Sequence, residues 1–183
     1  MRIIDDAITK ELAQDCIKEI EYKKKEHLWM ASNVFWPEGI KTNVTGTCIQ
    51  CSVSKPLKKR IVSQISEYLP DHKVLTFQFY IWLYNGAISN HNDYGHGFGV
   101  TIYLNEKWDV DYGGIFLWND NNDYQNPEYY KSWKACTPKY RTMILNDNLH
   151  DHLVTPVSPQ SPEFRYTIQI WGDPFIGATN KTS

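Results

Sequence analysis

The sequence has no excess of one charge and no long hydrophobic run. Its 183 residues include 19 Lys and Arg and 21 Asp and Glu, for a formal net charge of -2 at pH 7. A balance this close to neutral gives no sign of a surface for nucleic acid or membrane. No stretch could span a bilayer, and residues 1–14 lack the apolar segment of a signal peptide. We therefore expect a soluble, cytoplasmic protein with neither a nucleic-acid nor a membrane partner.

Cysteine is scarce, and its spacing excludes a disulfide scaffold. Among the four cysteines only Cys48 and Cys51 are close together, with the C-x-x-C spacing. No second pair completes a zinc site, and no strand-to-helix step of the thioredoxin type follows, so we expect two thiols in a small strand. A chain of this length can bury a core without metal or disulfides. We expect a single domain over residues 1–183.

The first part of the chain predicts helices. One is expected from Thr9 to about residue 26, because Thr9 can cap it and an apolar stripe follows at helical spacing. A second is expected over residues 54–70, opened by a serine and a proline and ended by a proline. Residues 28–47 mix aromatic residues with glycine and proline, which is typical of an irregular loop. Residues 1–72 are thus predicted to be a helical support region.

From residue 75 onward the pattern changes to alternation. Between residues 75 and 84 apolar residues alternate with an uncharged face made of Thr76, Gln78, Tyr80, Trp82 and Tyr84. Similar two-faced segments follow at residues 99–105 and 165–171. Apolar outer faces covered by helices, with polar and aromatic inner faces, predict a closed or double-sheet barrel around a wet cavity. We place this core at residues 73–173.

His91-Asn-Asp93 lies between the first two of these strands. Side chains two residues apart in extended backbone point to the same side, so an imidazole and a carboxylate can reach one ion together. The triplet alone is weak, because polar triplets are common in turns. His150 or His152 could supply a second imidazole. Two imidazoles and one carboxylate form the facial triad that leaves positions open on Fe(II).

Arg165 shares its strand face with cavity-type residues. A lone arginine is more often solvated, but inside a barrel a buried arginine needs an anionic partner. Its guanidinium fork can hold a carboxylate with two hydrogen bonds. A cosubstrate that chelates iron and carries a second carboxylate would suit such a cavity.

Six pieces of the chain carry a family resemblance. They are Tyr84-Asn-Gly86, His91-Asn-Asp93, Thr101-Ile-Tyr-Leu-Asn105 with Trp108, Gly113-Gly114, His152-Leu-Val-Thr-Pro-Val157 and Arg165-Tyr-Thr-Ile-Gln-Ile-Trp171. In this order, the segment from Tyr80 to Trp171 resembles the Fe(II)- and 2-oxoglutarate-dependent dioxygenases of the prolyl hydroxylase group. The resemblance implies a mainly β protein (α+β), in which N-terminal helices support a double-stranded β-helix, or jelly-roll, core.

The resemblance also implies a metal site. At the matching positions, His91, Asp93 and His152 would be the iron ligands. His152 is favoured over His150, because the family places its distal histidine two residues before a valine and four before a proline. His96 is expected at the rim of the cavity or in a loop.

The same positions imply a cosubstrate pocket. Arg165 with Tyr103 would hold the C5 carboxylate of 2-oxoglutarate, and Tyr84 and Thr101 would line that pocket. The implied reaction uses O₂ and couples decarboxylation of 2-oxoglutarate to succinate and CO₂ with hydroxylation of a C–H bond. Ascorbate could assist. The carboxylate of Asp93 favours hydroxylation over halogenation, because a halogenating site has a small residue there to admit chloride.

The core motifs are closest to the prolyl hydroxylases, which predicts a prolyl residue of a peptide or protein as substrate. A free amino acid or another small molecule is the alternative. Specificity is expected from two aromatic loops, residues 28–47 (Trp29, Phe35, Trp36) and 119–138 (Tyr124, Tyr129, Tyr130, Trp133). The Asn-rich stretch in the second loop predicts a mobile surface loop rather than a calcium site.

Two rival classes remain open. A metal-free jelly-roll module that binds sugar or peptide would share the fold without needing the two histidines, the aspartate and the arginine together. A cupin-type isomerase or metal-storage protein would lack the match at Arg165.

Overall fold

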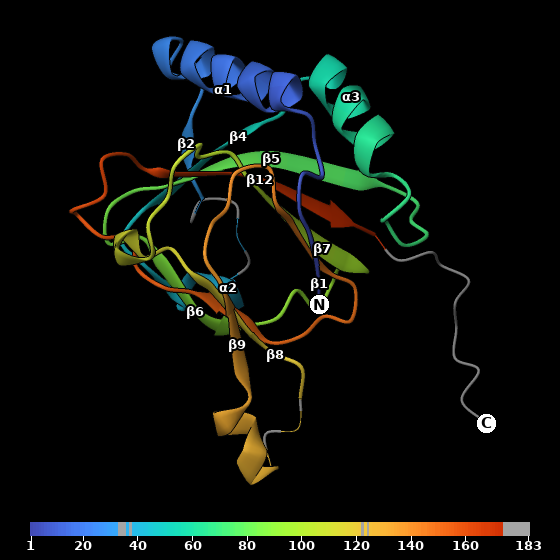
Figure 1. Cartoon of the computed structure of the whole chain (residues 1–183), viewed down its shortest axis with the longest axis vertical. Helices are drawn as coiled ribbons and strands as arrows, with labels where there is room; N and C mark the ends of the chain where they lie inside the picture. The colour runs from blue at the N-terminus through green and yellow to red at the C-terminus, as the bar shows by residue number, and fades with distance from the viewer. Residues whose placement is uncertain (33–35, 37, 122, 124, 174–183) are drawn as a thin grey trace.

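The computed structural model describes residues 1–32, 36, 38–121, 123 and 125–173. Two antiparallel sheets form its centre, as the predicted jelly-roll core requires (Figure 1). The elements in chain order are β1 (Arg2–Ile4), α1 (Lys10–Lys25), β2 (Met30–Ala31), α2 (Glu38–Lys41), β3 (Val44–Thr45), β4 (Cys48–Ser52), α3 (Lys55–Ile65), β5 (Leu75–Trp82), β6 (Ala87–His91), β7 (Phe98–Tyr103), the 3₁₀ helix η2 (Val110–Tyr112), β8 (Phe116–Asn119), the 3₁₀ helix η3 (Pro127–Lys131), β9 (Trp133–Cys136), β10 (Met143–Asn146), β11 (His152–Val154) and β12 (Arg165–Gly172).

The larger sheet has the strand order β1-β10-β7-β12-β5-β4-β2, and the smaller has the order β3-β6-β11-β8-β9. At the middle of the larger sheet, β12 pairs with β5 over its whole length and with β7 over most of it. Such a continuous ladder holds every side chain of β12 in a defined register. The two sheets enclose a cavity whose lining comes from both of them.

Two helices cover the outer face of the larger sheet (Figure 1). In α1 the Thr9 side chain accepts the Leu12 N–H at 3.3 Å, so the predicted cap is present. The second predicted helix is present as α3 but ends at Ile65, five residues earlier than expected. The next residues form tight turns, in which Tyr68 N–H donates to the Ile65 carbonyl. No described helix is long and apolar enough to cross a membrane.

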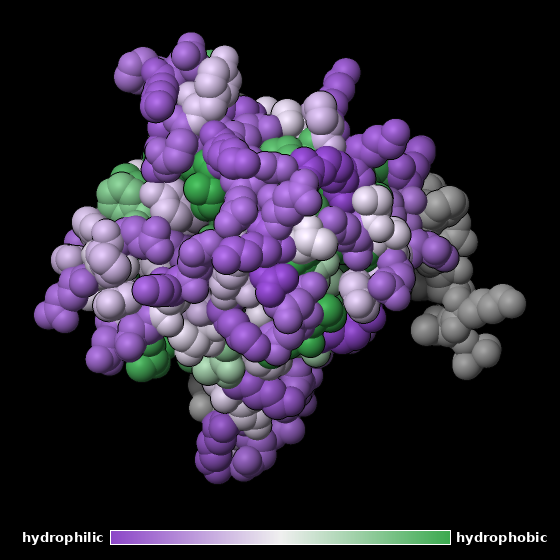
Figure 2. All heavy atoms as spheres, turned by 45° about the horizontal axis from the view of Figure 1, so that its top comes forward, coloured by the Kyte–Doolittle hydropathy of each residue, from purple (hydrophilic) through white to green (hydrophobic). Residues whose placement is uncertain are grey.

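The helices and the larger sheet share the main hydrophobic core. Inward side chains of α1 and α3 pack with the odd-numbered residues of β5, Phe77, Phe79 and Ile81. The even-numbered residues Thr76, Gln78, Tyr80 and Trp82 line the cavity on the other face. The predicted two-faced strand is therefore confirmed. The outward side of the helices is mostly hydrophilic, with isolated apolar side chains (Figure 2).

Residues 1–72, predicted to be a helical support region, contain α1, α2 and α3 together with strands. This part of the chain also supplies β1, β2 and β4 to the larger sheet and β3 to the smaller one. β4 pairs with β5 and so covers backbone groups that would otherwise form an open edge. Cys48 and Cys51 lie in β4, in a small strand as expected. Both are free thiols, and burial raises the pKa of each to about 12, which disfavours redox chemistry.

Candidate metal and cosubstrate site

Three predicted ligands meet where the neighbouring strands β6 and β11 of the smaller sheet end and begin. His91 ends β6, Asp93 follows two residues later, and His152 begins β11. His91 and His152 are register partners, and their ring centroids lie 4.2 Å apart. Asp93 Oδ2 lies 3.7 Å from His152 Nε2. One ligand atom from each residue lies within 4.8 Å of the other two, a spacing that a single metal ion can bridge.

Both imidazoles are oriented by the backbone. His91 Nδ1 lies 2.9 Å from the Ser89 carbonyl oxygen, and His152 Nδ1 lies 2.9 Å from that of His150. Because a carbonyl oxygen only accepts, each Nδ1 donates a proton and each Nε2 keeps its lone pair for a metal. Burial, with a smaller effect of His152, lowers the pKa of His91 to about 4. His91 is therefore neutral at pH 7, the state that binds metal.

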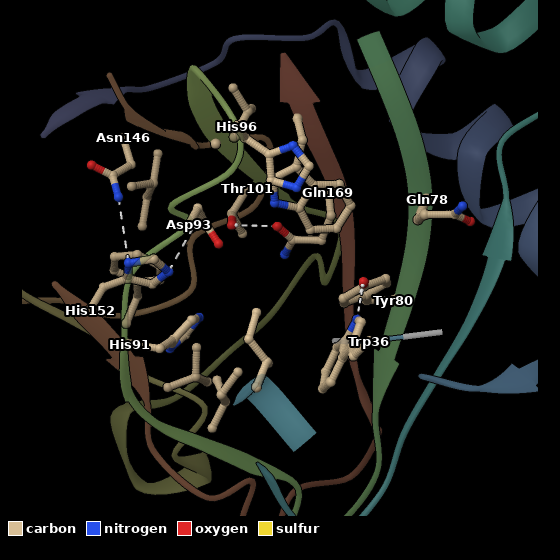
Figure 3. Close-up of a pocket in the computed structure, with 18 of the residues that line it drawn as sticks. Trp36, Gln78, Tyr80, His91, Asp93, His96, Thr101, Asn146, His152 and Gln169 are labelled. Atoms are coloured by element: carbon tan, nitrogen blue, oxygen red, sulfur yellow. Dashed lines mark hydrogen bonds and ion pairs between the residues drawn. The ribbon is translucent and has the colours of Figure 1, made fainter. Parts of the chain in front are cut away.

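The smaller sheet faces a cavity of about 530 Å³. In Figure 3, His91, Asp93 and His152 lie on one side of this space, and Trp36, Tyr80 and Gln169 lie on the other. Gly99 of β7 leaves room for the Asp93 carboxylate, because a Cβ at that position would lie 2.7 Å from Asp93 Oδ2. The donor set, two imidazoles and a carboxylate, fits Fe(II).

Arg165 presents unpartnered charge to the same cavity. Its side chain is 0% exposed, and its guanidinium carbon lies 5.0 Å from the centre of the Tyr103 ring. Within the described residues, neither the three guanidinium nitrogens nor the Tyr103 hydroxyl has a hydrogen-bond partner. Burial raises the pKa of Tyr103 to about 12, so the phenol stays a donor. Buried donors of this kind fit a ligand carboxylate.

Gly114 gives Arg165 its space. This glycine has a φ of 61°, and an added Cβ would lie 2.6 Å from Arg165 Cδ. The left-handed backbone and the close approach both require glycine here. Of the Gly113-Gly114 pair singled out in the sequence, Gly114 thus borders the Arg165 side chain, whereas Gly113 lies against the Pro156 backbone.

Thr101 and Tyr84 were both predicted to line the cosubstrate pocket, and the structure places only Thr101 at the cavity. Thr101 lines the cavity, and its hydroxyl lies 2.9 Å from Gln169 Oε1. Tyr84 is not among the lining residues. It is 37% exposed, and its hydroxyl donates to the Ser161 carbonyl at 3.2 Å. The alternation that predicted Tyr84 in the pocket stops at Trp82, where β5 ends.

The competing histidines lie apart from the three-residue cluster. His150 Nε2 is 3.9 Å from Asp120 Oδ1, and His150 does not belong to the group that could hold a metal. His96 lines the cavity, with Nδ1 3.7 Å from Asp173 Oδ1. These positions agree with the choice of His152 and with a rim position for His96.

Aromatic side chains form part of the cavity wall. Trp36 Nε1 donates to the Tyr80 hydroxyl at 2.8 Å, and the Tyr80 and Trp171 rings lie 5.7 Å apart. Trp36 and Tyr80 lie across the cavity from His91 and His152 (Figure 3), and Trp171 also lines the cavity. Alternation in β5 and β12 had placed Tyr80 and Trp171 on the cavity faces of their strands, and the hydrogen bond from Trp36 to Tyr80 is what the sequence did not indicate.

The predicted aromatic loops are only partly at the cavity. Trp36 lines it, whereas Trp29 packs against the main core. Tyr129 is buried and Trp133 is half-buried, and neither is a lining residue. Phe35, Tyr124 and the Tyr130 side chain lie outside the described residues.

A family model described as the 2OG-Fe(II) oxygenase superfamily matches residues 75–172. This span includes the three clustered residues together with Arg165, Tyr103 and Thr101. No curated protein matches the chain.

Solved structures share the fold at low identity. A prolyl-4-hydroxylase from Pseudomonas putida is 12% identical, with a TM-score of 0.65 over 95% of this chain and 92% of that one. A prolyl hydroxylase from Trichoplax adhaerens, in complex with a peptide fragment of the hypoxia inducible factor oxygen degradation domain, is 16% identical, with a TM-score of 0.67 over 94% and 82%. The epimerase SnoN from nogalamycin biosynthesis is 10% identical, with a TM-score of 0.67 over 93% and 75%. Identities this low support the jelly-roll fold and no particular substrate.

Proposed function

The chain belongs to the 2OG-Fe(II) oxygenase superfamily, and from this premise we propose that it hydroxylates a prolyl residue of a peptide or protein. Fe(II) and 2-oxoglutarate fit both the family and the His-Asp-His donor set. The substrate alternative is a free amino acid or another small molecule.

We assign the roles of the residues as follows. His91, Asp93 and His152 would hold Fe(II) at the wall of the cavity. Arg165 and Tyr103 hold the far carboxylate of 2-oxoglutarate, and Thr101 borders that pocket. When bound, Fe(II) and 2-oxoglutarate supply the oxidation of the C–H bond by O₂, with release of succinate and CO₂. The protein positions both reactants and limits the access of water.

One observation carries the proposal. The buried donors of Arg165 and Tyr103 lack partners and line or border the same cavity as three metal-capable side chains. A metal-free binding module needs no such cluster, and a cupin-type metal protein needs no buried arginine opposite it. A ligand that chelates the metal at one end and carries a carboxylate at the other satisfies both features.

The cavity favours an uncharged substrate group. Among its described lining residues Arg165 is the sole Lys or Arg, and in this proposal the cosubstrate occupies it. The carboxylate of a free amino acid would find no second Lys or Arg among the described lining residues, whereas a prolyl residue within a peptide carries no charge. Trp36, Tyr80 and Trp171 offer aromatic faces that suit a proline ring. The likeness to SnoN keeps a neutral small molecule as the alternative.

The cosubstrate is tested first. Anaerobic addition of Fe(II) and then 2-oxoglutarate should give the visible charge-transfer band of the iron chelate. Either rival class predicts no such band. His152→Ala is the matched negative control, because it removes one proposed ligand from the cluster.

The substrate is tested by mass spectrometry. A library of proline-containing peptides and free proline are incubated in parallel with the enzyme, Fe(II), 2-oxoglutarate and ascorbate. We expect a peptide to gain one oxygen atom, with an equal amount of succinate formed. Oxygen on free proline or another metabolite, with every peptide unmodified, would contradict the peptidyl assignment and leave the dioxygenase assignment intact.

A further inference from the structure

The segment that follows β8 is hydrogen-bonded to Asp151, the residue directly before the proposed ligand His152. We define the arm as residues 119–131, apart from 122 and 124; it ends in η3, near the bottom of Figure 1. Asn119 N–H donates to the Asp151 carbonyl at 3.0 Å, and the Tyr129 hydroxyl lies 3.1 Å from Asp151 Oδ2. The Asn119 amide also donates to the Tyr129 carbonyl. Asn119 and Asp151 are 0% exposed and Tyr129 is 2% exposed, so the triangle of polar groups is buried.

Asp151 and Tyr129 are also hydrogen-bonded to residues beside the other two proposed ligands, His91 and Asp93. Asn92, which lies between His91 and Asp93, donates from Nδ2 to Asp151 Oδ1 at 3.1 Å. Asn90, on the other side of His91, donates from Nδ2 to the Tyr129 hydroxyl at 2.9 Å. Asp151 itself directly precedes His152. A single buried carboxylate is therefore bonded to the segments that carry all three clustered side chains.

We propose that Asp151 and Tyr129 are positioning residues of the metal site, and that metal binding is coupled to docking of the arm. This inference rests on the proposed ligand set of His91, Asp93 and His152. The backbone at each ligand is held by its neighbours, Asn92 and Asp151, and not by the ladder of the sheet alone. Partners at one remove from a metal typically change its affinity 10- to 100-fold.

The coupling works in both directions. If the docked arm strengthens metal binding, the bound ion must stabilise the docked arm by the same factor. The contacts that transmit this effect are the Asn92–Asp151 and Asp151–Tyr129 hydrogen bonds. Asp151→Asn removes the negative charge and one acceptor oxygen from this pair of bonds, and Tyr129→Phe removes the bond to Asp151 together with the one from Asn90.

The first test measures Fe(II) affinity by anaerobic calorimetry on the full chain. Asp151→Asn should weaken binding about 10- to 100-fold, and Tyr129→Phe should weaken it by about 10-fold or less. Matched controls are Asp123→Asn on the exposed part of the arm and Tyr112→Phe in η2, and both should bind as the unaltered protein does. If Asp151→Asn does not fold, Tyr129→Phe and Asn92→Ala give the same test.

A second readout separates positioning from stability. A merely structural role would lower the melting temperature and leave the Kd of the folded protein unchanged, which would overturn the proposal. If Asp151 acts through Asn92, the double variant Asp151→Asn with Asn92→Ala should lose little more affinity than Asp151→Asn alone. Additive losses would contradict that route.

Hydrogen exchange tests the reverse direction. Added metal should slow amide exchange in residues 126–131 of the unaltered protein, and Tyr129→Phe should reduce this protection while β6 keeps its own. Equal protection of residues 126–131 in both proteins would refute the coupling. If the unaltered protein binds no Fe(II), the ligand set fails together with this inference. If it binds normally and Asp151→Asn binds equally well, only this inference fails.

Discussion

The two walls of the cavity are built in different ways. On the larger sheet, Thr101 and Gln169 are register partners within strands that are paired on both edges. On the smaller sheet, the metal-capable residues lie at strand ends, and the β6–β11 register shifts between His152 and Val154. We call the wall formed by the larger sheet the cosubstrate wall, because Arg165 and Thr101 are proposed to bind 2-oxoglutarate. The pairing of the strands fixes the positions of its side chains. We call the wall formed by the smaller sheet the metal wall, after its three proposed ligands. The positions of these ligands depend on turns and on the buried polar contacts of Asp151 and Asn92.

This difference suggests how each wall should fail. A change on the larger sheet should remove one interaction and leave the strand in place, so its effects are graded. A change at the strand ends of the smaller sheet removes a ligand or its alignment, and three ligands are few enough that the loss of one is decisive. Four predictions test this contrast, in order of decreasing effect.

The largest effect is expected at the metal wall. His152→Ala should abolish Fe(II) binding and turnover, since it leaves two ligands. His150→Ala should retain both, because His150 lies beside Asp120 and outside the cluster. Iron retained after anaerobic desalting and succinate release measure the two properties. Iron loss in His150→Ala with retention in His152→Ala would reverse the assignment.

A graded but large effect is expected at the cosubstrate wall. Removal of one partner of a buried charge pair costs about 3–5 kcal/mol, so Arg165→Ala should weaken 2-oxoglutarate binding by two or more orders of magnitude. Arg165→Lys should retain part of the affinity. Fe(II) affinity without 2-oxoglutarate should not change, because Arg165 belongs to the other wall. Titration of the charge-transfer band measures the cosubstrate, and an unchanged affinity in Arg165→Ala would remove its proposed role.

Gly99 is where the two walls meet. Gly99 belongs to the larger sheet, yet a Cβ there would press on the Asp93 carboxylate at 2.7 Å. Overpacking typically costs about 1–3 kcal/mol, so Gly99→Ala should weaken Fe(II) binding by about 5- to 150-fold. Calorimetry with Fe(II) measures this loss. An effect on 2-oxoglutarate alone would mean that Asp93 adapts, and the contrast between the walls would be weaker than proposed.

The sequence predicted the parts of the fold that obey local periodicity. The two faces of β5 follow from strand alternation, and α1 follows from its cap and apolar stripe. The strands β1, β2 and β3 were missed because each has two or three residues and forms by pairing with distant partners, whereas β4 was expected as a small strand at Cys48 and Cys51. Local propensity carries little information about such strands.

The candidate site was predictable where its residues are close in sequence or match the family motif. His91 and Asp93 are close in sequence, and the family motif indicated the third residue of the cluster. The contacts of Asp151 with Asn92 and Tyr129 join residues 59 and 22 positions apart, so no local pattern could have indicated them. Tyr84 does not line the cavity in the structure, because the alternation ends with β5 and a turn follows, where Asn85 has a φ of 62°.

The smallest effect distinguishes Thr101 from Tyr84 within the predicted pocket. Thr101→Val keeps the shape of the side chain but removes the hydroxyl that contacts Gln169. A neutral hydrogen bond is worth about 0.5–1.5 kcal/mol, so 2-oxoglutarate binding should weaken by about 2- to 12-fold if this contact holds Gln169 at the pocket. Tyr84→Phe should leave that affinity unchanged, because its hydroxyl bonds to the Ser161 carbonyl away from the cavity lining. Parallel titrations of both variants with 2-oxoglutarate decide the matter. A weaker affinity in Tyr84→Phe than in Thr101→Val would return Tyr84 to the pocket and mean that the turn after β5 closes onto the cosubstrate when it binds.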